Sequence, residues 1–138
     1  MKLFKKTEVI IVAAILCVVS AMTLPKFSKA DTDQRLDTLC NQLQLVRSQL
    51  SLYHIQHQQQ WPRQATFAEQ MTGKTNVKGT TNPVDGDLVF GPYLQCIPFN
   101  PFTGGNAVDG RDWYYDEKTG KFVSADDGQT RGIVHKNL

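Results

Sequence analysis

The chain has 138 residues, of which 41% are apolar and 20% charged, with a formal net charge of +2. This size supports one small folded domain and excludes a multidomain enzyme. Five lysines and one glutamate give residues 1–30 a charge of +4, whereas ten basic and twelve acidic side chains give residues 31–138 a charge of −2. The basic bias therefore belongs to the N-terminal segment and does not mark a nucleic-acid-binding face.

An uncharged apolar run dominates the N-terminal segment. It covers the sixteen residues from Val9 to Leu24, with three lysines before it and two soon after it. A membrane-spanning helix needs about 20 residues, and lysines before a span favour a cytoplasmic N-terminus. We therefore expect a short cytoplasmic leader over 1–8 and the transmembrane half of a long helix over 9–27.

Three interpretations of this segment are open. The first is a secretory signal peptide cleaved after Ala30, where Ser28-Lys29-Ala30 forms a small-x-small site. The second is a plain membrane anchor. The third is a helix that assembles with a partner. It depends on Glu8, a carboxylate at the start of the apolar run, where desolvation is costly unless a partner neutralises the charge.

Beyond Pro25 the apolar residues become periodic, and their spacings of three and four predict one stripe of an amphipathic helix over 28–60. We expect helix from Phe4 to Gln60, with a bend or local melt at Pro25 and an end before Trp61-Pro62. The stripe could pack against another chain in a coiled coil, or against residues 61–138 of the same chain. We favour packing within the chain, because residues 61–138 need the apolar stripe to complete a hydrophobic core. The stripe consists of Leu36, Leu39, Cys40, Leu43, Val46, Leu50, Tyr53 and His57.

The rest of the chain is rich in turns. Residues 66–71 are predicted to form a short helix, and aromatic segments at 113–115 and 121–123 predict a β-hairpin around the turn 116–120. The fold class is therefore α+β, with one long helix packed on a small antiparallel sheet. We expect the small domain to cover 61–125 and a flexible tail to cover 126–138.

Glu8, the continuous apolar helix and Pro25 seventeen residues later resemble the N-terminus of type IV pilins and type II secretion pseudopilins. Phe4 stands where the mature first residue of that family lies, and Leu3 stands where the family has Gly. The resemblance to the major, G-type pseudopilin extends to about Ser124. It is carried by Gly91-Pro92-Tyr93-Leu94, Ile97-Pro98, Asn100-Pro101-Phe102-Thr103-Gly104 and Trp113-Tyr114-Tyr115-Asp116.

The resemblance implies a pilin-like structural subunit of a pseudopilus or related filament, which supports protein secretion. It implies a single-pass inner-membrane protein with a periplasmic C-terminal domain. Its partners would be other pseudopilin subunits in a homopolymer, an inner-membrane assembly platform and a prepilin peptidase acting between Leu3 and Phe4. Assembly would use Glu8, Phe4 and Pro25, with the Glu8 carboxylate paired to the N-terminal amine of a neighbour.

A second class of function is a non-assembling periplasmic adaptor or binding domain, which is membrane-anchored or released by cleavage after Ala30. No serine or cysteine has a base beside it in the sequence, and no glycine-rich phosphate loop opens a helix, so we predict no catalysis. No cofactor other than a calcium ion is implied.

The sequence contains three candidate ligand or cross-link sites. The resemblance implies a calcium ion near Ser124, Asp126 and Asp127, since major pseudopilins carry one in their C-terminal loop. Cys40 and Cys96 could form a disulfide if the helix packs on the strand that contains Cys96, and two buried free thiols are the alternative. His54 and His57 share a helix face but lack a third metal ligand at a fixed spacing.

Overall fold

The structure, a computed structural model, describes the backbone of residues 5–138 and the side chains of residues 5–18 and 29–138. Leu3 and Phe4, the predicted processing site, lie outside the described residues, and so does the side chain of Pro25. The chain divides into two compact units, Met1–Gln34 and Arg35–Leu138.

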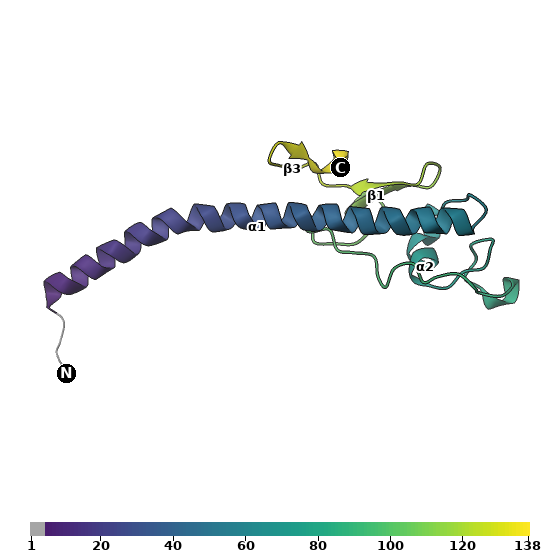
Figure 1. The fold of residues 1–138 in the computed structure, drawn as a ribbon, viewed down its shortest axis with the longest axis horizontal. Helices are drawn as coiled ribbons and strands as arrows, with labels where there is room; N and C mark the ends of the chain where they lie inside the picture. Colours follow the sequence, from purple (N-terminus) through teal and green to yellow (C-terminus); the bar gives the residue numbers. More distant parts are fainter. Residues whose placement is uncertain (1–4) are drawn as a thin grey trace. The chain divides into compact units, whose positions relative to one another are not determined.

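The elements confirm an α+β chain with two small antiparallel sheets. Figure 1 shows β1 and α2 beside the part of α1 that belongs to the second unit. In chain order the elements are α1 (Lys6–Gln56), η1 (Gln64–Thr66), α2 (Phe67–Thr72), η2 (Pro83–Asp85), β1 (Trp113–Asp116), β2 (Lys121–Ser124), β3 (Gln129–Thr130), β4 (Ile133–Val134) and η3 (His135–Asn137).

Helix α1 passes through Pro25 without the predicted interruption and ends four residues earlier than expected, at Gln56. The glutamine run ends it, because Gln58 and Gln59 take left-handed conformations with φ of 57° and 61°. The Gln59 N–H donates to the His54 carbonyl oxygen at 2.8 Å, which closes the last turn. A helix that ends through left-handed residues satisfies its final carbonyls in this way.

The predicted stripe of α1 forms the centre of the hydrophobic core, so it packs within the chain. Leu39 and Val46 are completely buried, whereas Cys40, also assigned to the stripe, is exposed. The stripe contacts aromatic side chains of β1 and β2 together with two residues of α2. The main members of this core are Leu39, Leu43, Val46, Leu50, Tyr53, Phe67, Met71, Trp113, Tyr115 and Phe122.

The predicted hairpin of β1 and β2 is confirmed. Trp113 lies opposite Ser124 and Asp116 opposite Lys121. The turn requires a glycine, because Gly120 has a φ of 71° and a Cβ there would lie 2.5 Å from the Trp61 ring. Alternation along β1 places Trp113 and Tyr115 in the core and leaves Tyr114 49% exposed, as expected for a sheet with one wet face.

Residues 126–138, expected to be a flexible tail, contain the hairpin of β3 and β4 followed by η3. Arg131 and Gly132 form its turn with φ of 52° and 76°. The His135 N–H donates to the Gly128 carbonyl oxygen at 3.0 Å. Leu138 packs against the core, so this segment closes one side of the domain.

The expectation of a single-pass inner-membrane protein, with a cytoplasmic N-terminus and a periplasmic domain, is wrong. Among the residues that the structure describes, no helix has a stretch long and apolar enough to cross a membrane. The apolar run from Val9 to Leu24 has only sixteen residues; Glu8 precedes it, and Pro25 and Lys26 follow it. The transmembrane half assigned to 9–27 is corrected accordingly.

Replacing Leu43 with alanine should lower the free energy of unfolding by about 2–5 kcal/mol, because it opens a cavity under the hairpin. Leu43 is 1% exposed, whereas Leu45 on the same helix is 51% exposed and makes a matched control. Leu45→Ala should change stability by less than about 0.5 kcal/mol. Urea unfolding checks both variants, and equal losses would contradict the assigned core.

Candidate functional site

The first ten residues of the apolar run, Val9–Val18, form a helical surface that we call the apolar segment. Seven of its large side chains are 54–67% exposed. They occupy positions 9, 10, 11, 12, 15, 16 and 18, which point in every direction around a helix. Such a helix, apolar all round, is normally covered by other apolar groups.

Glu8 stands at the start of this segment, in the first turn of α1. Its Oε2 accepts a hydrogen bond of 3.2 Å from the Lys5 backbone N–H. A glutamate at the third helical position that reaches back to the N-cap N–H is one half of a capping box, and its charge also favours the helix N-terminus. Glu8 therefore has a local helix-starting role, and the amine partner implied by the resemblance is a separate prediction.

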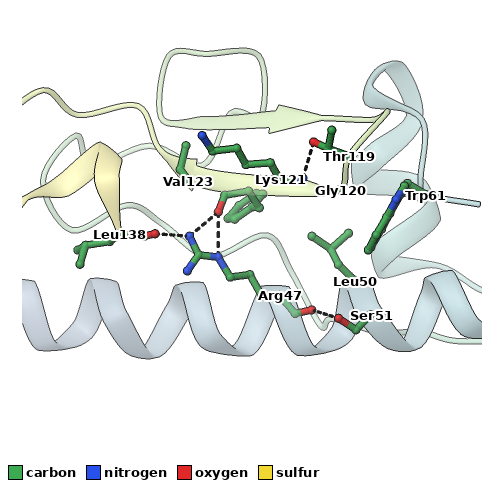
Figure 2. Close-up of a pocket in the computed structure, with 10 residues that line it drawn as sticks. Arg47, Leu50, Ser51, Trp61, Thr119, Gly120, Lys121, Val123 and Leu138 are labelled. Carbon is green, nitrogen blue, oxygen red and sulfur yellow. Dashed lines mark hydrogen bonds between the residues drawn. The ribbon is translucent and has the colours of Figure 1, made fainter.

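In the second unit a groove lies between α1 and the β1–β2 hairpin, with a volume of about 320 Å³. Figure 2 shows Leu50 and Trp61 on one side of it and Arg47 reaching from α1 toward the hairpin. Ser51 also lines the groove, and its hydroxyl group donates a hydrogen bond of 3.0 Å to the Arg47 carbonyl oxygen. The hydroxyl hydrogen of Ser51 is therefore already used within the helix. We call this cavity the hairpin groove.

Arg47 connects three parts of the chain that are distant in sequence. Its Nε and Nη2 donate to the Phe122 carbonyl oxygen at 3.1 and 2.9 Å, and Nη2 also donates to the Leu138 main-chain oxygen at 2.7 Å (Figure 2). A planar guanidinium suits such paired donation. This role of Arg47 was not predicted, because no residue near it in the sequence indicates its partners.

The three residues predicted to hold calcium are engaged with protein groups. The Ser124 hydroxyl oxygen accepts from Asn100 Nδ2 at 2.8 Å. Asp127 forms an ion pair with Lys136 at 2.7 Å, and Asp126 contacts the ring of His135. Within the described residues no group of three or more His, Cys, Asp or Glu side chains could hold a metal. The calcium site stays a prediction.

Asp126 belongs instead to a chain of polar contacts that sequence reasoning also missed. His135 is 2% exposed. Its Nδ1 contacts Asp126 Oδ2, and its Nε2 lies 2.9 Å from Thr130 Oγ1. The imidazole stacks on Phe102 at a centroid distance of 3.9 Å. This arrangement fastens β3 to η3 and explains why the C-terminal segment is folded.

The remaining predicted residues lie apart from any common site. Cys40 and Cys96 are free and exposed, so the structure contains neither the predicted disulfide nor the alternative pair of buried thiols. His54 stacks on Trp61 at 4.0 Å. His57 is buried, and its ring nitrogens lie 2.8 Å from the Tyr53 carbonyl oxygen and from Thr75 Oγ1. Both of its nitrogens are therefore already used.

Comparison of the chain with protein-family models, curated proteins and solved structures found no match.

Replacing Arg47 with methionine should reduce the free energy of unfolding by about 2 kcal/mol, because it removes charge-assisted hydrogen bonds and leaves the Phe122 carbonyl unpaired. Lys121→Met is the matched control, since Lys121 lines the same groove but is exposed. Urea unfolding measures stability, and amide exchange of Leu138 should accelerate only in the Arg47 variant. An unchanged exchange rate would contradict the role of Arg47 in holding η3.

Stability should also depend on His57 as the pH changes. Burial lowers the pKa of the His57 imidazole, and its main-chain hydrogen bonds offset this only in part. As the pH is lowered, His57 therefore binds a proton at a higher pH in the unfolded chain than in the folded chain. The free energy of unfolding falls as the pH drops below about 6.5, and it stops falling below the pKa of His57 in the folded chain. Urea unfolding at pH 7.5 and 5.5 should show this loss in the native chain and in His54→Gln, and a smaller loss in His57→Gln. Equal losses in all three proteins would contradict the role of His57 in the pH dependence of stability.

Proposed function

We propose that this chain is a structural subunit of a filament, pilin-like in its organisation and of the type II secretion pseudopilus or type IV pilus kind. The apolar segments of neighbouring copies would pack together in the filament core, and the second unit of each copy would form the outer surface. Addition of subunits would lengthen the filament and push secreted protein outward. The chain's work in this proposal is mechanical.

The observation that carries the proposal is the exposure of the apolar segment. Fully burying one large apolar side chain is worth about 1.5–3 kcal/mol, so seven of them provide on the order of 10 kcal/mol per copy before the costs of association. In the part of the chain that the structure describes, each of these side chains is left more than half exposed. A second copy of the same helix offers the matching apolar surface.

Glu8 supports the same proposal. Burial of the apolar segment would also remove the Glu8 carboxylate from water, and burying an unpaired carboxylate costs free energy. A cation from a neighbouring copy would offset this cost by pairing with Glu8. The N-terminal amine and the lysines at positions 5 and 6 are the cations nearest in sequence. A charge pair of this kind would fix the axial register between copies, which apolar contact alone leaves undetermined.

Replacing Val12 with aspartate should abolish assembly of the full chain, because it would bury an unpaired charge between helices. Val12 is 54% exposed, so the folded domain should keep its melting temperature. Analytical ultracentrifugation and negative-stain electron microscopy would compare the variant with the native chain. We expect filaments or large oligomers from the native chain and monomers from the variant.

Val84→Asp is the matched control, because it makes the same substitution at an 86% exposed position of η2 in the second unit. It should assemble as the native chain does. A native chain that stays monomeric at all concentrations would refute the filament proposal and favour the non-assembling adaptor. Loss of assembly in both variants would show that added charge, and not the apolar segment, is responsible.

A further inference from the structure

A second hollow, about 250 Å³ in volume, lies between η1, α2 and the loop at 78–82. It differs from the hairpin groove in being lined mainly by polar side chains. We call it the threonine hollow. Its lining consists of Arg63, Thr66, Glu69, Gln70, Lys78, Gly79, Thr80, Thr81 and Asn82.

The walls of the threonine hollow are fixed by Gln70, which is 7% exposed. Its Oε1 accepts from the Arg63 backbone N–H at 2.8 Å and from Thr66 Oγ1 at 3.1 Å, and its Nε2 donates to the Gly79 carbonyl oxygen at 2.8 Å. Gly79 has a φ of 80°, and a Cβ there would lie 2.4 Å from Tyr53 Oη. The loop is therefore held tightly against α2, and the hollow exists before any ligand arrives.

Two cations and one carboxylate line the hollow. Within the described part of the chain, the side chains of Arg63 and Lys78 make no hydrogen bond or ion pair. Glu69, the only acid in the lining, is exposed. Arg63 and Lys78 are exposed as well, so the lining carries two cationic groups and one acid. This excess of positive charge favours an anionic ligand, and guanidinium and ammonium groups are the usual partners of phosphate and carboxylate.

Thr80 supplies a second, independent observation. Its hydroxyl oxygen is buried and has no hydrogen-bond partner among the described residues, although its backbone N–H is bonded to Asn76 Oδ1 at 3.0 Å. A buried hydroxyl without a partner is rare in folded proteins and costs free energy. Thr80 lines the hollow, but its hydroxyl oxygen is not exposed there, so donation to a bound acceptor requires a rotation about χ1 to another staggered position.

We propose that the threonine hollow binds a small oxyanion, namely a phosphate or carboxylate group. Arg63 and Lys78 contact its oxygens, and the Thr80 hydroxyl donates to it. The group is either a free ion or the charged end of a larger molecule, since both present the same oxygens. This site lies outside the apolar segment and is independent of the filament proposal.

The test titrates the full chain with inorganic phosphate, and separately with acetate, at pH 7 and constant ionic strength. Amide chemical shifts of Gly79 and Thr80 report binding. We expect saturable shifts in the native chain, and Arg63→Gln and Lys78→Gln should each weaken binding by roughly tenfold, because each removes a charge-assisted hydrogen bond. The tighter of the two probes shows whether the hollow prefers a phosphate or a carboxylate group.

Three further variants make the test specific. Lys74→Gln removes an exposed lysine outside the lining and should leave binding unchanged. Glu69→Gln should tighten binding, because it removes the one carboxylate that repels the anion. Thr80→Val should raise the melting temperature of the ligand-free chain, since an unpaired buried hydroxyl is lost, and should weaken phosphate binding.

Shifts that rise linearly without saturation, or that are equally reduced by Lys74→Gln and Lys78→Gln, would overturn the site as a case of general ionic attraction. Unchanged affinity in Thr80→Val would overturn the role of the hydroxyl. The melting temperature of each variant in chloride alone shows whether the domain is folded. Any loss of binding in a variant that melts at or above the temperature of the native chain then belongs to the site.

Discussion

Packing of the α1 stripe on the β1–β2 hairpin is the interaction on which the second unit depends. In residues 5–138 the structure contains two sheets of two strands each, and an isolated two-stranded hairpin is at best marginally stable in water. Burial of Trp113, Tyr115 and Phe122 against Leu43 and its neighbours supplies the missing free energy. The helix is therefore part of the core and not an attachment to a finished domain.

Because so little of the second unit is regular sheet, side chains must satisfy much of its backbone. Arg47, Asn100 and Gln70 each bond main-chain groups that are far apart in sequence. Asn100 is completely buried and donates to the Asp112 carbonyl oxygen at 2.8 Å while accepting from the Phe102 N–H at 2.9 Å. Such bonds replace the ladders that a larger sheet would provide.

The sequence predicted what depends on local pattern. The stripe from Leu36 to His57 was found by its helical spacing, and the β1–β2 hairpin was found from aromatic strands around a glycine turn. The ordered C-terminal segment was missed, because the contacts of His135 with Asp126 and Phe102 depend on tertiary placement. The membrane span was wrongly predicted, because an apolar run indicates a surface that is buried from water but does not show whether lipid or protein covers it.

The division of one helix between two units has an evolutionary consequence. In the second unit each stripe residue meets particular neighbours, so the shape of the side chain at Leu43 or Tyr53 is constrained position by position. In the apolar segment, exposed side chains surround the helix, so exchange among valine, isoleucine and leucine preserves its apolar surface. Selection should therefore conserve identity in one part of α1 and only composition in the other, so that sequences could drift apart along the same helix at two different rates.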